Sequence, residues 1–223
     1  MENFLNYDNT FIKTNVHLVT RPAQVIHAYV NGIRKRYSSP ISYFAISLTI
    51  SGLYIFFVQK FYPDVMDMSG IYSGEGTQEV TRKITEFLMD YNSLFYFFLI
   101  PAMAFISRLV FLRNGYNYTE HVVIYLYTMS ISAIISSLIS IVMVIAFPDY
   151  YLAWGMTFNI MMVLYHCYIL KQVFELSLFG IIKKTLLFLL IFLFFYIGIS
   201  IIIGILLFVF GGFDPADFTP PQN

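Results

Sequence analysis

Long runs of apolar residues constrain this chain more than any other feature of its sequence. Five such runs occur, at about residues 41–57, 94–112, 122–147, 152–170 and 185–210. A helix needs roughly 20 consecutive apolar residues to cross the hydrocarbon layer of a bilayer. We therefore predict five membrane-spanning helices, of which the second carries Arg108 and the fifth is the longest purely apolar run.

The same runs decide the fold class. Transmembrane β-strands span about ten residues and alternate apolar with polar side chains, a pattern that these continuous runs do not follow. The 223-residue chain is 58% hydrophobic and 12% charged, whereas soluble domains are about 45–50% apolar and about 25% charged. The sequence therefore predicts an all-α fold: a polytopic membrane helix bundle of about five transmembrane helices with an N-terminal amphipathic interfacial helix.

Lys and Arg predict which way the bundle faces, because they are enriched in the cytoplasmic flanks of membrane helices. With the N-terminus inside, ten lie on the cytoplasmic side and three on the outer side. The inner residues are Lys13, Arg21, Arg34, Lys35, Arg36, Arg108, Arg113, Lys171, Lys183 and Lys184, and the outer residues are Lys60, Arg82 and Lys83. We expect a multi-pass protein of the bacterial inner (cytoplasmic) membrane, with its N-terminus inside and its C-terminus outside.

Three regions follow from this topology. Residues 1–40 form a cytoplasmic N-terminal segment with an amphipathic helix, and residues 41–210 form the five-helix transmembrane domain. An outer loop at 62–92 has helical spacing in its second half, which either forms a separate helix or extends the second span. Residues 211–223 hold two acidic residues and three prolines, so we expect a disordered extracytoplasmic tail.

The amphipathic helix is expected to begin at Pro22, because proline is well tolerated at the first position of a helix. Its apolar face would carry Val25, Ile26, Tyr29, Val30 and Ile33. Such a helix either lies in the cytoplasmic interface of the bilayer or docks on the protein's own cytoplasmic face.

Charged residues near the inner ends of the second and third spans form a candidate polar cluster with two arginines of the N-terminal segment. It comprises Arg34, Arg36, Arg108, Arg113, Glu120 and His121. Arg108 either extends its guanidinium to the interface or pairs with Glu120. Glu120 either caps its helix or joins the cluster. A joined cluster would lock the N-terminal helix to the bundle or bind an anionic lipid headgroup, because arginine binds carboxylate and phosphate with two hydrogen bonds.

The fourth span holds a candidate intramembrane polar pair, Asn159 and His166. These residues are seven positions apart, so they share one face of the helix. Such side chains either hydrogen-bond to neighbouring helices or line a path for a ligand or proton. Small residues in the third and last spans favour close helix packing or a contact with a protein partner or a second copy. They are Ser130, Ala133, Ser136, Ser137, Ser140, Ser200 and Gly204.

The sequence predicts no catalytic, cofactor-binding or metal-binding residues. Cys167 is the only cysteine, and the four histidines fall at different predicted depths, whereas a zinc site needs three or four converging ligands. Aromatic residues cluster near the span ends, which is typical of an interfacial belt rather than of a surface for nucleic acid. We therefore expect no cofactor and no nucleic-acid partner.

Three stretches resemble a known family: 20–22 with 29–37, Pro40 and Tyr43; 117–121; and 168–196. They are similar to a bacterial membrane-protein family of unknown function, DUF3667, which is common in Bacteroidetes. The resemblance implies a multi-helix membrane domain with an inner N-terminus, and it carries no activity with it. Many members begin with a zinc ribbon of paired cysteines, which this chain lacks, and often have histidine where this chain has Tyr127.

These observations favour a non-enzymatic membrane protein, most simply an accessory or assembly subunit. The alternative is a carrier or binder of a lipid or small solute, which Asn159 and His166 favour. Against a carrier, the sequence has no inverted repeat and no paired broken helices. A membrane enzyme is the third possibility. The expected partners are membrane lipids, chiefly anionic headgroups at the inner face, because basic residues near a bilayer attract them.

Overall fold

The computed structural model describes the backbone of residues 2–66 and 90–209. Within these ranges every regular element is helical, so the predicted all-α fold is confirmed. The expectations for most of the outer loop, at 67–89, and for the tail at 211–223 fall outside the described residues.

Five helices are long and apolar enough to cross a membrane, which confirms the predicted number of spans. They are α3 (Pro40–Phe61), α5 (Asn92–Val110), α6 (Tyr118–Ala146), α7 (Tyr151–Val173) and α8 (Leu178–Val209). Two short 3₁₀ turns, η1 (Pro63–Met66) and η3 (Pro148–Tyr150), follow α3 and precede α7. The chain is therefore a multi-pass membrane protein.

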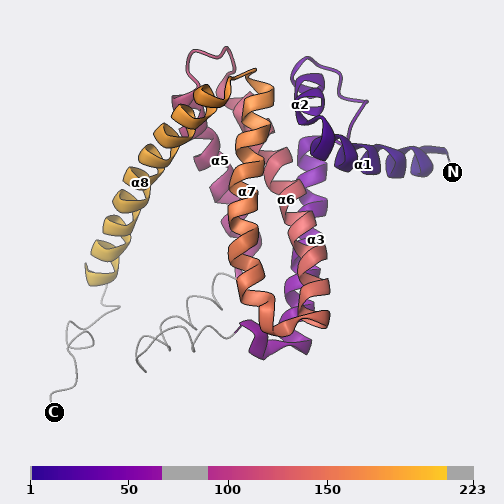
Figure 1. Ribbon diagram of the computed structural model, residues 1–223, viewed down its shortest axis with the longest axis vertical. Helices are drawn as coiled ribbons and strands as arrows, with labels where there is room; N and C mark the ends of the chain where they lie inside the picture. The colour runs from indigo at the N-terminus through magenta and orange to yellow at the C-terminus, as the bar shows by residue number, and fades with distance from the viewer. Residues whose placement is uncertain (1, 67–89, 210–223) are drawn as a thin grey trace.

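Helix α6 lies in the middle of the bundle (Figure 1). Half of its span is buried, compared with 22% of α3 and 6% of α7. It packs chiefly against α3 and α5 and also contacts α7. The hydroxyl oxygens of Ser51 on α3 and Ser137 on α6 lie 3.3 Å apart, because small side chains let two helices approach closely. The serine face of α6 is thus used inside the chain.

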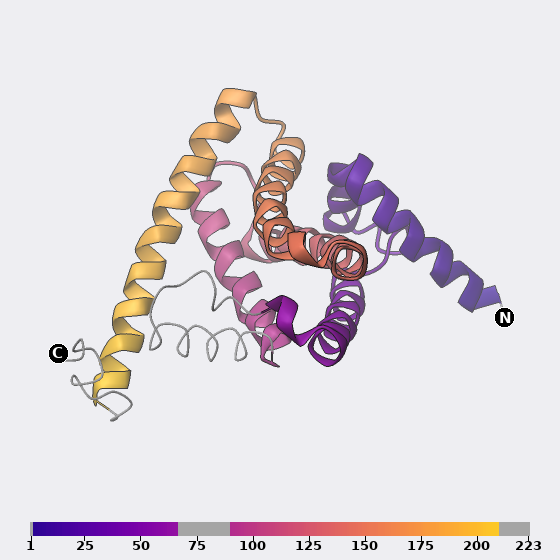
Figure 2. The ribbon, with the colours of Figure 1, turned by 60° about the horizontal axis from the view of Figure 1, so that its bottom comes forward.

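Helix α8 is the most loosely packed span. It contacts α5 and α7 and leans away from the rest of the bundle (Figures 1 and 2). Only 6% of the described part of its span is buried. Most of its surface is therefore available to lipid.

Two helices precede the first span, and the sequence predicts only the second of them. They are α1 (Glu2–Thr20) and α2 (Pro22–Val30). Helix α1 runs across the spans and projects away from the bundle, whereas α2 lies beside the ends of α6 and α7 (Figure 1). The side chains of Val25 and Ile26 on α2 are fully buried. Of the two alternatives for this helix, α2 therefore docks on the protein itself rather than lying free in the bilayer interface.

The predicted apolar face of α2 is wrong at its last member, Ile33. The helix ends at Val30, and Ile33 lies beyond it and is 53% exposed. Gly32 has a φ of 85°, and the amides of Gly32 and Ile33 donate to the carbonyls of Tyr29 and Ala28. This is a Schellman motif, in which a left-handed glycine closes the last turn of a helix.

Tyrosine hydroxyls fasten the N-terminal helices to the spans. Tyr127 of α6 donates to the carbonyl of Ser38 at 2.7 Å, and Tyr165 of α7 donates to the carbonyl of Leu18 at 3.0 Å. Tyr127 and Leu18 are fully buried. A buried carbonyl that loses its donor costs about 1–3 kcal/mol, so these two bonds hold the segment that enters the first span.

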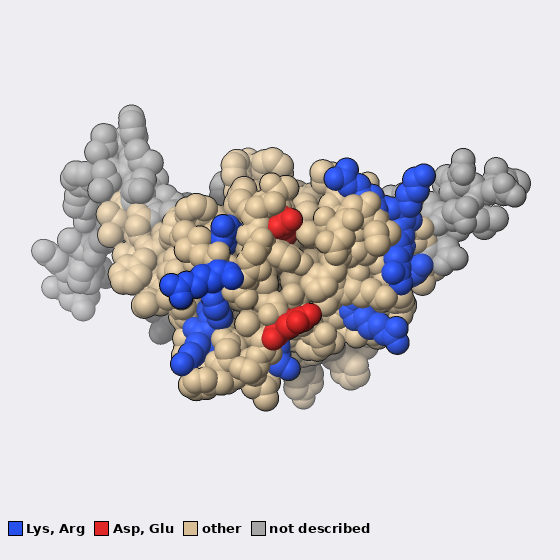
Figure 3. All heavy atoms as spheres, turned by 90° about the horizontal axis from the view of Figure 1, so that it is seen from above, with Lys and Arg blue, Asp and Glu red and all other residues tan. Residues whose placement is uncertain are grey.

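Lys and Arg gather at the end of the molecule where α3, α6 and α8 begin (Figure 3). Among the described residues, Lys60 at the far end of α3 is the exception. We call this end the basic rim and define it by Lys13, Arg21, Arg34, Lys35, Arg36, Arg108, Arg113, Lys171, Lys183 and Lys184.

We expect the basic rim to face the cytoplasm, because basic flanks resist translocation. In a Cys167→Ala background, a single cysteine replaces Asn31 near the rim or Asp149 at the opposite end, both of which are exposed. A membrane-impermeant thiol reagent should label Asp149→Cys and spare Asn31→Cys in intact cells, and it should label both after permeabilisation. If Asn31→Cys alone were labelled in intact cells, the predicted orientation would be wrong and the basic rim would face outward.

Loss of the Tyr127 hydroxyl should destabilise the fold. We expect Tyr127→Phe to cost about 1–3 kcal/mol, because the carbonyl of Ser38 loses a buried donor. Tyr125→Phe is the matched control, since the Tyr125 hydroxyl is buried and has no hydrogen-bond partner among the described residues. Thermal unfolding in detergent should show a lower Tm for Tyr127→Phe and an equal or higher Tm for the control. Equal losses would contradict the assignment of the bond.

Candidate functional site

Glu120 caps α6. Its backbone amide donates to the side-chain oxygen of Asn117 at 3.0 Å, and its carboxylate accepts a hydrogen bond from the backbone amide of Asn117 at 2.7 Å. This reciprocal pair is a capping box, which satisfies amides at the start of a helix. Burial and then the charge of Glu120 raise the pKa of the neighbouring Tyr116 to about 12, because both disfavour the phenolate.

Arg34 and Arg36 contact aromatic rings rather than the rest of the candidate polar cluster. The guanidinium of Arg34 lies 5.7 Å from the ring centroid of Tyr29, and that of Arg36 lies 5.5 Å from the centroid of Tyr37. Both arginines are exposed. Cation–π contacts at exposed sites contribute about 0.5–1 kcal/mol, and they leave the charge free to meet lipid headgroups.

Arg108 and Arg113 also lie apart from the carboxylate of Glu120. Arg108 donates to the carbonyl of Leu112 at 3.2 Å, within its own turn of the chain. Arg113 is exposed. Neither forms an ion pair with Glu120 within the ranges that the structure describes. The structure therefore does not join the candidate cluster into one site, and its binding of an anionic headgroup stays a prediction.

His121 belongs to the core and not to the surface of the rim. It is fully buried, and its Nδ1 lies 2.9 Å from the hydroxyl of Ser107 on α5. Its ring stacks on Phe174 with centroids 5.6 Å apart. The Nε2 atom is buried and has no partner among the described residues. Contact with headgroups through this side chain is not possible in this arrangement.

The candidate intramembrane pair is divided between two cavities. Asn159 is exposed and donates from Nδ2 to the carbonyl of Gly155 at 2.8 Å, within its own helix. It lines a cavity of about 310 Å³ formed mainly by α6 and α7, with Tyr54 of α3 and Tyr96 of α5 also in its wall. His166 lines a different cavity nearer the basic rim, and Met162 lines both.

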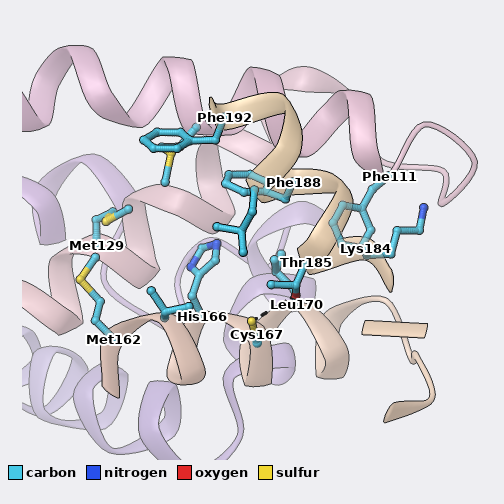
Figure 4. Close-up of a pocket in the computed structure, with 13 residues that line it drawn as sticks. Phe111, Met129, Met162, His166, Cys167, Leu170, Lys184, Thr185, Phe188 and Phe192 are labelled. Carbon is cyan, nitrogen blue, oxygen red and sulfur yellow. Dashed lines mark hydrogen bonds between the residues drawn. The ribbon is translucent and has the colours of Figure 1, made fainter. Parts of the chain in front are cut away.

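The His166 cavity lies among α5, α6, α7 and α8 and has a volume of about 270 Å³ (Figure 4). Both ring nitrogens of His166 are buried and have no partner in the described part of the chain. The ring packs on Tyr125 with centroids 4.5 Å apart. Figure 4 shows the imidazole pointing into the cavity toward Phe188. An unpaired buried polar atom costs about 1–3 kcal/mol, and a hydrogen-bonding partner that reached the ring would remove that cost.

The His166 cavity is lined almost wholly by apolar atoms, and its few polar side chains other than His166 lie at the end near the rim. Near the rim, Lys184 donates to the carbonyl of Val110, and Cys167 and Thr185 hydrogen-bond at 3.2 Å. The remaining walls are apolar and rich in methionine, a flexible side chain that adapts to ligands of different shape. They include Met103, Met129, Met162, Phe188 and Phe192.

The mouth of the cavity lies between α7 and α8. Three of its lining residues, Val163 on α7 and Leu189 and Phe192 on α8, are themselves exposed. Their helices are membrane spans, so the surface around this mouth is covered by lipid. The α7–α8 wall of the cavity therefore borders the acyl chains of the bilayer.

The sequence identifies His166 but misses the residues around it. Lys184 is noticed only as a charge that flanks the last span, and Cys167 and Thr185 carry no recognisable pattern. No group of three His, Cys, Asp or Glu side chains with metal-ligand geometry occurs among the residues described.

A stretch within the first quarter of the chain carries the similarity to known proteins. Residues 8–52 match a family described as "Protein of unknown function (DUF3667)". Over these residues the chain resembles that family. The match covers most of α1, all of α2 and the first part of α3. No curated protein and no solved structure shows significant similarity to the chain.

The His166 cavity of this DUF3667-like protein is built wholly from residues that follow the matched stretch. The family match therefore assigns neither a ligand nor a reaction to the cavity. What the cavity can hold must be argued from its own side chains.

Glu120 and Arg108 should act independently on stability, because each has its own backbone partner. We expect the effects of Glu120→Gln and Arg108→Gln on thermal stability in detergent to be additive within about 0.3–0.5 kcal/mol. As a positive control, Asn117→Ala should cost about 1 kcal/mol through the lost cap. A coupling above about 1 kcal/mol that grows with added anionic lipid would instead support the joined cluster.

Proposed function

We propose that this DUF3667-like membrane protein is non-enzymatic and binds a lipid or small apolar solute in the His166 cavity. The observation that carries the proposal is an imidazole with two buried, unpartnered nitrogens inside an apolar cavity that opens to the bilayer. Ligand pockets are typically apolar, with a few polar groups that fix the orientation of the ligand.

The chemistry of His166 favours a ligand with one hydrogen-bonding oxygen. A neutral imidazole offers one N–H donor and one acceptor nitrogen. A hydroxyl can donate to the acceptor, and a hydroxyl or a carbonyl can accept from the donor. A pure hydrocarbon would leave both nitrogens unpaired, at a cost of about 1–3 kcal/mol for each.

The position of the few polar side chains at one end of the cavity favours an amphiphile held in one direction. Thr185 and Lys184 lie toward the basic rim, while Met162 and Phe192 lie deeper in the bundle. A molecule whose polar end faces the rim and whose tail points into the bundle would match both ends. This is also the direction in which a lipid of the leaflet at the rim lies.

A non-enzymatic role rests on how the reactive side chains are arranged. The sulfur of Cys167 pairs with the hydroxyl of Thr185 rather than with an imidazole or carboxylate that would activate it. An accessory or assembly subunit is the second candidate function. It is supported by α7 and α8, each with only 6% of its span buried, whereas the serine face of α6 that first suggested a subunit contact is occupied by α3.

The basic rim supports a cytoplasmic membrane setting with anionic lipids as partners. Each Lys or Arg near an anionic bilayer surface contributes roughly 1 kcal/mol of attraction, and salt screens it. Arg34, Lys35 and Arg36 are exposed, so they are available for such contacts.

Filling the His166 cavity should abolish binding of an amphiphile. The probe is a fatty alcohol with a photoactivatable diazirine on its chain, added to the purified protein in nanodiscs. We expect crosslinks to map to cavity residues, and we expect Thr185→Phe, which fills the space, to reduce them several-fold. The matched control is Leu186→Phe, since Leu186 is 62% exposed and does not line the cavity.

Thr185→Phe and Leu186→Phe add the same side chain one position apart on α8. Comparing them distinguishes binding in the cavity from binding on the lipid-facing surface of the helix. His166→Phe should reduce crosslinking by the fatty alcohol more than crosslinking by an alkane with the same diazirine. Equal crosslinking in Thr185→Phe and Leu186→Phe, or crosslinks spread evenly over α7 and α8, would contradict the proposed function.

A further inference from the structure

Helix α1 carries an apolar stripe that the protein itself does not cover. Ile12, Val16 and Val19 are 62%, 52% and 48% exposed. Their spacing of four and three residues places them on one face of the helix. Helix α1 is not a span, and it runs across the spans at the level of the basic rim (Figure 1). We call these three side chains the apolar stripe.

One side of α1 contacts the chain just before the first span. His17 Nδ1 lies 2.7 Å from the hydroxyl of Tyr37, and the hydroxyl of Thr14 accepts a hydrogen bond from the Ser38 amide at 3.0 Å. Tyr37 and Ser38 precede α3. This side of α1 therefore faces the connection at the basic rim.

The next side of α1 contacts a point further along α3. The Asn15 side chain accepts a hydrogen bond from the Tyr43 hydroxyl at 2.9 Å, and the Phe11 and Tyr43 rings lie 5.6 Å apart. Helix α3 runs from the rim into the bilayer, so Tyr43 lies deeper than Ser38. The side of α1 that carries Thr14 therefore faces the rim, and the side that carries Asn15 is turned further toward the bilayer.

The apolar stripe comes next in the same rotation. Successive residues of a helix are about 100° apart, which places Val19, Ile12 and Val16 beyond Asn15 on the side away from His17. The stripe therefore lies on the side of α1 that faces the acyl chains.

A side of α1 about a quarter-turn from the apolar stripe is cationic. The Lys13 ammonium lies 5.7 Å from the ring centroid of Tyr37. Burial, followed by the positive charges of Lys13, Arg21 and Arg36, lowers the pKa of His17. These cations therefore gather on the rim side of α1, where phosphate groups of a bilayer would meet them.

We propose that α1 is an interfacial membrane helix, with its apolar stripe inserted among the acyl chains of the bilayer that the bundle spans and its cationic side among the headgroups. An interfacial helix has this division into an apolar and a basic face. The occupant of the stripe is lipid, because the stripe points along α3 into the bilayer and the cations lie on the rim side of the helix. This role is independent of the His166 cavity, which contains no residue of α1.

The test is a depth measurement on single cysteines in the full chain. In a Cys167→Ala background, Ile12→Cys, Val16→Cys and Val19→Cys each carry an environment-sensitive fluorophore. Lys13→Cys is the matched control, one position along the same helix and on its cationic side. The protein is placed in nanodiscs of phosphatidylethanolamine with a minority of phosphatidylglycerol, so that each disc holds one copy and both faces are accessible.

We expect doxyl-labelled phospholipid to quench the three stripe positions several-fold more than the control, and acrylamide to quench them several-fold less. Equal quenching by acrylamide at the stripe and at Lys13→Cys would overturn the proposal, since the stripe would then face water. Protection of the stripe from both quenchers would also overturn it, because protein and not lipid would cover it.

Discussion

The packing of α6 between α3 and α5 is the interaction on which the rest of the structure depends. In a bilayer, apolar surface gains little by leaving lipid for protein, so close van der Waals contact and hydrogen bonds must hold helices together. The small side chains of α6, Ser137 among them, allow this contact with α3. The same helix places Tyr127 against the connection to the first span and Met129 in the wall of the His166 cavity.

Sequence patterns were sufficient for the spans and for α2, and insufficient for the first N-terminal helix, α1. Spans are recognisable because lipid imposes both their length and their composition. Helix α1 is not, because its Asn, Thr and Val residues have modest helix propensity and its position depends on distant contacts such as Tyr165 with Leu18. Its stripe at Ile12, Val16 and Val19 is visible in the sequence once a helix is assumed. The end of α2 is also recognisable in the sequence, because Gly32 stands where a glycine commonly closes the last turn of a helix.

The candidate polar cluster shows why proximity in a topology does not ensure pairing. Asn117 and Glu120 lie three residues apart, so the capping box forms without closing a loop between helices. Pairing of Glu120 with an arginine on another helix would compete with that local bond. The His166 cavity could not be predicted at all, because it depends on the angle at which α8 leans from α7. No pattern in residues 178–209 specifies that angle.

Met162 has a consequence for the length of any molecule held inside the bundle. Its side chain forms the partition between the cavity of His166 and that of Asn159. Along α7 the stretch from Tyr151 to His166 rises about 22 Å at 1.5 Å per residue, which is most of the thickness of a bilayer's hydrocarbon layer. An unbranched thioether has three rotatable bonds, so a change of this one side chain would alter the space between the two cavities. If the bundle holds a lipid as proposed, the size of the residue at position 162 would set how long a tail fits.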